Sequence, residues 1–168
     1  SLVCCSSGEV DLYLVGSDSS ASLTPFSAEL GDDVQRVVVE SSVTGQETLG
    51  TWLMPDLWAG EVPGGTWQFA INYEISNAAG VQINATATVD IGSKSFSAST
   101  EPAGSFLAQG VGTLTFDIDV EAFTSSGNSN IELTLTAQAI AFQVPGSDAS
   151  FELLWGTEAE DSALTATI

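Results

Sequence analysis

The fold class is decided by the stretch Thr66-Trp67-Gln68-Phe69-Ala70-Ile71-Asn72-Tyr73-Glu74-Ile75-Ser76, in which apolar and polar residues alternate without a break. Residues 81–91 alternate in the same way after the link Asn77-Ala78-Ala79-Gly80. A period of two is typical of a β-strand that has one face in a core and one face in water. The short link, which contains Asn and Gly, predicts a hairpin turn between the two strands.

The same alternation continues through most of the chain. Residues 113–121 and 131–141 form two more clear strands, and 125–130 is expected to be the loop between them. In the second of these strands the odd-numbered residues from Ile131 to Ala141, including Ala139, are expected on the core face. Weaker strands are expected at 10–15, 34–43, 51–54, 93–99, 150–155 and 163–168, with room for one helical turn at 22–30 or 158–162.

Strands that are apolar on one face and polar on the other form antiparallel sheets with one wet face, and two such sheets must cover each other. The sequence therefore predicts an all-β fold, an antiparallel β-sandwich of about eight to ten strands. The long connections favour a jelly roll over an immunoglobulin-type sandwich. We expect a single domain over residues 9–168, preceded by an N-terminal arm over residues 1–8.

The charge balance is strongly one-sided. Arg36 and Lys94 are the only basic residues among 168, against 22 acidic ones, so the formal net charge is −20. High salt relieves the resulting repulsion, because the screening length falls from about 10 Å at 0.1 M to about 3 Å at 1 M. This composition is typical of a protein that works in brine or seawater, or that meets cations or a basic partner. It excludes nucleic-acid backbones and anionic membrane surfaces as partners. No apolar run reaches the ~20 residues of a membrane span, so we expect no membrane insertion.

The absence of histidine limits the chemistry available to the chain. It rules out a Ser-His-Asp or Cys-His arrangement and any imidazole metal site. We find no phosphate-binding loop either, and therefore predict no catalytic residues and no enzymatic activity. Cys4 and Cys5 are adjacent, a spacing at which a mutual disulfide is strained. Free or buried thiols, an inter-subunit disulfide and a lipid anchor remain open for this pair.

Acidic residues on one strand face form the candidate metal site. Asp117, Asp119 and Glu121 alternate along 113–121, which places neighbouring carboxylates roughly 6.5–7 Å apart. That spacing indicates a solvated acidic face, with weak binding of Ca²⁺ or another cation as the alternative. The acidic runs at 31–33 and 158–161 are interpreted as surface charge. No other cofactor is expected.

Three apolar residues are candidates for an interface. Trp58 lies in a loop context and is expected to anchor a subunit interface, to stack on a sugar, or simply to cap the sandwich edge. Leu2 and Val3 lie in the N-terminal arm and could reach a neighbouring subunit. Trp67, by contrast, is on the apolar face of its strand and is expected in the core.

One pattern resembles a known class of proteins. Thr51-Trp52-Leu53-Met54-Pro55, followed by Val62-Pro63-Gly64-Gly65-Thr66-Trp67-Gln68-Phe69, is similar to the strand, turn and aromatic pattern of jelly-roll structural proteins of tailed viruses. The resemblance covers roughly residues 48–156. It implies a virion surface component, namely a capsid decoration, turret or tail protein or a small jelly-roll capsid protein, from a halophilic or marine system. The family has no catalytic residues to carry over.

The sequence thus favours a non-enzymatic virion protein that self-assembles as a homo-oligomer and contacts other virion proteins. One alternative is a secreted filament or cell-surface subunit of a halophile, located outside the cell, in which residues 9–15 complete a neighbour's sandwich by strand donation. The other is a carbohydrate-binding β-sandwich module that uses Trp58 and the acidic loops.

Overall fold

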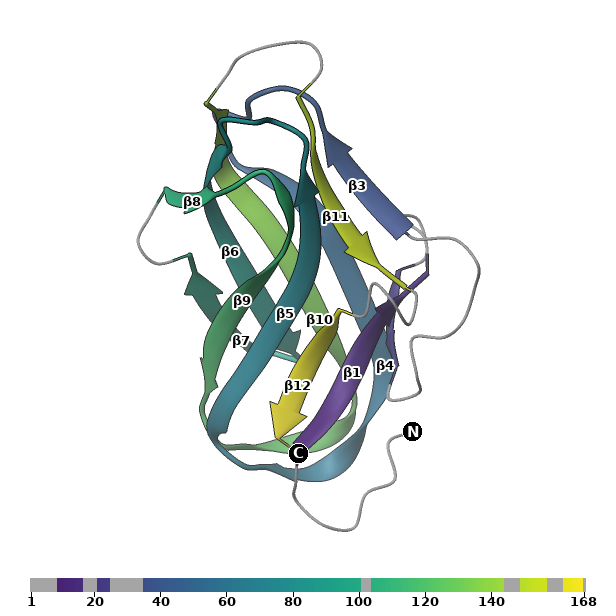
Figure 1. The fold of residues 1–168 in the computed structure, drawn as a ribbon. Helices are drawn as coiled ribbons and strands as arrows, with labels where there is room; N and C mark the ends of the chain where they lie inside the picture. Colours follow the sequence, from purple (N-terminus) through teal and green to yellow (C-terminus); the bar gives the residue numbers. More distant parts are fainter. Residues whose placement is uncertain are drawn as a thin grey trace.

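The computed structural model describes residues 9–16, 21–24, 35–100, 104–143, 149–156 and 162–167. These residues form strands and connecting turns, with no helix among them (Figure 1). No helix in the described ranges is therefore long and apolar enough to cross a membrane. The strands are β1 (Glu9–Val15), β2 (Ser22–Thr24), β3 (Gln35–Val39), β4 (Glu47–Val62), β5 (Gly65–Ile75), β6 (Val81–Ile91), β7 (Lys94–Ser99), β8 (Ser105–Leu107), β9 (Gly110–Val120), β10 (Phe123–Phe142), β11 (Phe151–Trp155) and β12 (Ala163–Thr167).

The predicted all-β sandwich is confirmed. Early strands pair antiparallel with late ones in a nested series, β1 with β12, β4 with β10, β5 with β9 and β6 with β7. The series produces two facing layers, β1-β12-β5-β9 and β4-β10-β6-β7, which is the strand order of a jelly roll. Strands β11 and β3 extend the first layer beside the end of β5, and β2 connects β1 to β4 (Figure 1).

The core lies between the two layers and is built by the alternation in the sequence. Trp67 is fully buried on β5 and stands opposite Ile118 of β9, as its strand position predicts. An aromatic series crosses the core from Trp155 to Trp52, Phe69 and Phe116, with successive ring centroids 5.3, 6.2 and 5.8 Å apart. Aromatic pairs at these separations contribute about 0.5–1.5 kcal/mol each beyond their buried area.

The link between β5 and β6 forms a turn but not the predicted hairpin. The Gly80 N–H donates to the Asn77 carbonyl at 3.0 Å, and Gly80 takes a φ of 84° that suits glycine. The two strands nevertheless belong to different layers, since β5 pairs with β9, β11 and β12 while β6 pairs with β7, β8 and β10. A strand alternates identically whether its neighbour pairs with it or faces it across the core, so the pattern could not separate the two arrangements.

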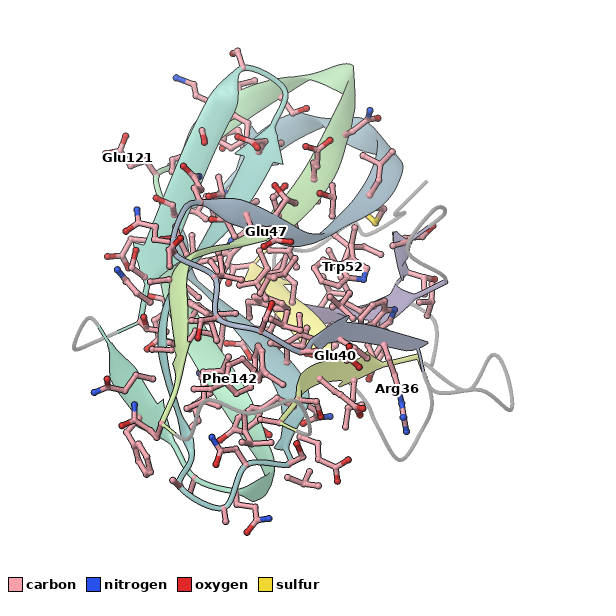
Figure 2. All side chains as sticks on the ribbon, turned by 90° about the horizontal axis from the view of Figure 1, so that it is seen from above. Arg36, Glu40, Glu47, Trp52, Glu121 and Phe142 are labelled. Atoms are coloured by element: carbon pink, nitrogen blue, oxygen red, sulfur yellow. The ribbon has the colours of Figure 1, made fainter. Side chains whose placement is uncertain are left out.

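Strand β10 differs from expectation in two places. The predicted loop at 125–130 is part of the strand, because residues 123–129 pair with the end of β4. Further on, Gln138 has no partner opposite it on β6, and this β-bulge reverses the alternation. Ile140 and Phe142 are therefore buried in the core, whereas Ala141 is exposed and Ala139 is half-exposed. Figure 2 shows Phe142 directed inward. A single extra residue moves every later side chain to the opposite face.

Two short strands were not expected from the sequence. Residues 22–24 form β2 instead of the start of a helical turn, and residues 105–107 form β8 on the edge of β6. The N-terminal arm at 1–8 and the acidic runs at 31–33 and 158–161 lie outside the described residues.

Candidate functional site

In the part of the chain that the structure describes, the sandwich has an open side between β3 and the first half of β4. Among the described strands, β3 pairs only with β11, and residues 47–51 of β4 pair only with β10. A cavity of about 360 Å³ lies on this side. Its described lining residues are Ala21, Val37, Thr48, Leu49, Gly50, Thr51, Trp52 and Trp155. The volume is within the range of small-molecule and side-chain pockets.

Two tryptophans form the floor of the cavity. The rings of Trp52 on β4 and Trp155 on β11 meet edge to face at 88°, and both side chains are fully buried. The Trp155 indole N–H donates to the carbonyl of Gly16 at 3.0 Å. The Trp52 indole N–H is also buried but has no acceptor among the described residues. An unpaired buried donor costs about 1–3 kcal/mol, so within the described residues the Trp52 indole carries an unmet hydrogen bond.

Gly50 gives the cavity wall its shape. A Cβ atom at this position would lie 2.5 Å from Cη2 of Trp52 and 3.0 Å from two further atoms of the same ring. The backbone of β4 therefore lies directly against the indole, and no side chain stands between the ring and the strand.

A polar hollow adjoins the cavity where the chain passes from β3 to β4. It has a volume of about 510 Å³ and is lined by residues 38–47, among them the exposed carboxylates of Glu40 and Glu47. Figure 2 shows both carboxylates on the same part of the molecule as Trp52 and Arg36. The cavity is thus lined by apolar, aromatic and threonine side chains, and the two carboxylates belong to the hollow beside it.

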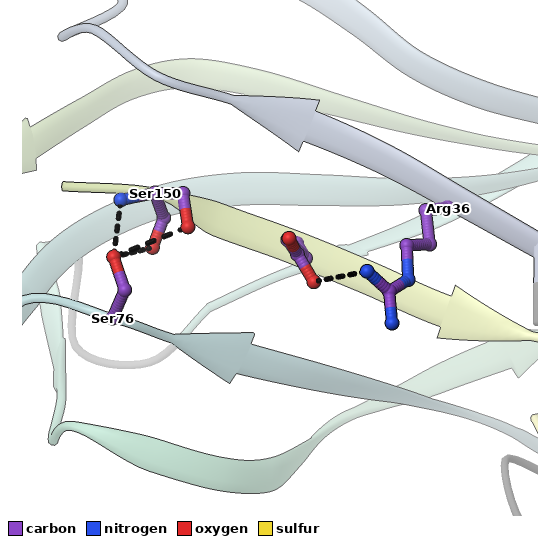
Figure 3. A network of polar contacts seen from close by, with 4 residues as sticks. Arg36, Ser76 and Ser150 are labelled. Carbon is purple, nitrogen blue, oxygen red and sulfur yellow. Dashed lines mark hydrogen bonds and ion pairs between the residues drawn. The ribbon is translucent and has the colours of Figure 1, made fainter. Parts of the chain in front are cut away.

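The basic group beside the cavity is already paired. Arg36 Nη1 lies 3.4 Å from Glu152 Oε2 on the neighbouring strand β11 (Figure 3). The Glu152 oxygen has no aligned hydrogen bond in this pair, so the contact is one of charge. Directly before the same strand, the Ser150 N–H donates to Ser76 Oγ at 2.6 Å (Figure 3). These contacts fix β11 between β3 and β5, and with it the position of Trp155.

The predicted metal candidates lie on the solvent-exposed face of the first layer, and their carboxylates do not come together at one point. Asp117 accepts a hydrogen bond from Gln68 Nε2 and Asp119 accepts one from Thr66 Oγ1, both at 3.2 Å. Glu121 follows the end of β9 and projects away from the sandwich (Figure 2). Within the described ranges no three Asp, Glu, Cys or His side chains come together as a possible metal site. Weak cation binding by these carboxylates stays a prediction.

The interface contacts expected of the three apolar candidates are outside what the structure describes, which holds for Leu2 and Val3 and for the side chain of Trp58. The expected loop at Trp58 is wrong, because this residue lies within β4, where residues 57–62 pair with β10. The sequence reasoning did not identify the cavity, although Gly50-Thr51-Trp52 contains its signal. A glycine two residues before a tryptophan, on the same face of a strand, leaves space that the indole can occupy.

One further buried group has an altered titration. Burial raises the pKa of the Tyr73 phenol above its ordinary value of 10.0. The ring lies over Gly112 of β9, where any Cβ atom would overlap the phenol oxygen.

Comparison with known proteins gives similarity in structure only. No protein-family model matches the chain, and no curated protein is similar in sequence. An aminopeptidase from the marine sediment archaeon Thaumarchaeota archaeon shares the fold with a TM-score of 0.63 and 10% identity, over 96% of this chain and 36% of its own. An α-amino acid ester hydrolase follows with a TM-score of 0.58 and 8% identity, over 94% and 36%. A CocE/NonD family hydrolase from Staphylococcus aureus has a TM-score of 0.59 and 6% identity, over 100% and 38%. The chain thus spans little more than a third of each of these proteins.

These comparisons overturn the predicted function. The prediction of a non-enzymatic, virion structural protein is wrong, because the solved structures named above, which share the fold, are an aminopeptidase and hydrolases. They equally give no support to a filament subunit or a carbohydrate-binding module. The residues behind the virion resemblance have roles in folding, since Trp52 and Trp67 are both buried in the core. Such a pattern reports the jelly roll, which unrelated functions share. The missing histidine excludes imidazole chemistry within these 168 residues. It does not exclude that the sandwich is part of an enzyme.

Proposed function

We propose that this chain is the β-sandwich part of a hydrolase that acts on ester or amide bonds. The observation that carries the proposal is the extent of the match, because the hydrolases align with 94–100% of this chain but only 36–38% of their own length. A sandwich of this kind accounts for about a third of each such enzyme. The bond types are those named for the aminopeptidase and the ester hydrolase. At 6–10% identity, the substrate of this chain is part of the proposal.

The composition indicates which catalytic groups of such an enzyme must lie outside this sandwich. These 168 residues contain no histidine, so a hydrolytic centre that uses an imidazole base takes it from another part of the protein. The sandwich contributes a rigid, tightly packed body whose side cavity and acidic surface can shape the approach of substrate. Substrates with a free amino group suit this surface, because its net charge of −20 attracts cations.

The test is an activity assay on the intact protein that carries this sandwich, isolated from its native source with an antibody raised against the chain. Hydrolysis of α-amino acid esters and aminoacyl anilides is expected, and it should exceed hydrolysis of the N-acetylated forms of the same substrates. The matched control is the same isolation with an unrelated antibody. Pure antigen without hydrolysis of either bond type would contradict the proposal.

A further inference from the structure

We infer that the open side between β3 and β4 binds an extended peptide, which pairs with β3 as an added strand and places an apolar side chain in the cavity above Trp52 and Trp155. The inference rests on the geometry of this side and goes beyond the proposed hydrolase role. Peptide binding tests this inference, whereas hydrolysis tests the proposed function, so either result can be negative without the other.

The exposed edge of β3 is the first step. This strand is the end of the strand order, and among the described strands only β11 pairs with it, so no described residue pairs with the N–H and C=O groups on its other edge. Its residues Val37, Val38 and Val39 are β-branched, and Val38 keeps 46% of its surface exposed. Sheet edges that must stay single normally carry lysine, proline or a bulge. The one charge on β3, Arg36, is paired with Glu152 and does not protect the edge.

The cavity is the second step. Alternate residues of an added strand point to the same face, so an extended peptide beside β3 directs every second side chain toward the space lined by Val37, Leu49 and Trp52. A volume of about 360 Å³ exceeds what one leucine or phenylalanine side chain fills, and the two indoles offer it an aromatic floor. A small molecule could fill the cavity, but unlike a peptide it would not form a strand's hydrogen bonds with the backbone of β3.

Charge complementarity fixes the remaining chemistry of the peptide. Glu40 and Glu47 are exposed in the polar hollow at 38–47, a segment that joins the cavity residues Val37 and Thr48 in the chain, and the whole chain carries a net charge of −20. An occupant whose outward residues are basic is attracted, whereas an acidic one is repelled. The predicted ligand is therefore an extended peptide in which apolar and basic residues alternate.

The experiment uses a seven-residue peptide of alternating leucine and lysine, blocked at both ends, with binding followed by calorimetry and by hydrogen exchange. We expect binding that slows exchange of the amides in residues 35–39. A serine–lysine peptide measures attraction by charge alone and should bind at least about tenfold more weakly. A leucine–lysine peptide methylated on the backbone nitrogens keeps the side chains but cannot pair as a strand, and it should lose the protection of β3.

Variants of the protein locate the site. Ala21→Leu fills the cavity and should weaken the leucine–lysine peptide about tenfold. Ala139→Leu adds the same atoms at a half-exposed position on β10, outside the cavity, and should leave binding unchanged. Equal binding of the methylated or serine-containing peptide, or protection of strands other than β3, would overturn the inference. Protection of β3 in a concentration-dependent dimer without peptide would also overturn it, because a second copy would then be the occupant.

Discussion

Gly50 and Trp52 are in a contact that leaves no room for a side chain at position 50. We predict that Gly50→Ala lowers the free energy of unfolding by about 1–3 kcal/mol, because the new Cβ must displace a fully buried indole. Gly45→Ala is the matched control, since no atom lies within 4 Å of its Cβ position, and it should change stability by less than about 0.5 kcal/mol. Urea denaturation measures both. Equal effects of the two substitutions would contradict the packing at Trp52.

Tyr73 gives the fold a pH dependence at the alkaline end. Its pKa is raised by burial, so the unfolded chain loses the phenol proton first as the pH rises. The stability that depends on this proton is intact below the ordinary value of 10.0 and is lost above it. We predict that the urea midpoint falls as the pH is raised above 10.0, and that Tyr73→Phe falls less. An equal decline in the unmodified protein and in Tyr73→Phe would contradict the role of the buried phenol.

In strand β10, the bulge at Gln138 determines which later side chains are buried. It buries Ile140, whereas unbroken alternation would bury Ala141. Ile140 is 1% exposed, so Ile140→Ala should cost about 2–5 kcal/mol of unfolding free energy. Ala141 is exposed, and Ala141→Ser should change stability by less than about 0.5 kcal/mol. A costly Ala141→Ser beside a tolerated Ile140→Ala would show that β10 continues without the bulge.

The elements show how far the sequence could predict the fold. Alternation placed β5, β6 and β9 on the correct residues and put Trp67 in the core. It could not tell which strands pair, because a strand has the same inward face in a hairpin and across a sandwich. The bulge in β10 was hidden for a similar reason, since alanines at 139 and 141 suit either face. The length of β10 was missed because Ser, Gly and Asn at 125–130 are typical of loops, yet pairing with β4 holds them extended.

The candidate site was less accessible to sequence reasoning than the fold. Its cavity is made by Val37, Trp52 and Trp155, which are far apart in the chain and come together only through the pairing of β3 with β11. The acidic face at Asp117 and Asp119 was visible in the sequence, but the side chains use their oxygens for cross-strand hydrogen bonds. The hydrolase proposal depends on similarity in three dimensions, at 6–10% identity, where no motif of this sequence points to it.

For the whole molecule, the dominant physical property is its charge. With a net charge of −20, repulsion within the folded state should ease as salt rises, so the unfolding temperature should increase between 0.1 M and 1 M NaCl. The double variant Asp117→Lys and Asp119→Lys reduces the negative charge on an exposed face and should have a shallower dependence on salt. Calorimetric scans in NaCl at constant pH measure both slopes. Identical slopes would mean that charge repulsion does not set the salt response.

The central proposal is that this jelly roll is part of a hydrolase and does not form a self-assembling shell. The most direct measurement is size-exclusion chromatography with light scattering on the intact native protein, with every fraction assayed for hydrolysis of α-amino acid esters and aminoacyl anilides. We predict one peak in which the antibody signal for this chain and the hydrolytic activity rise and fall together. Closed particles or homo-oligomers of the 168-residue chain, with the activity absent or in other fractions, would contradict the account.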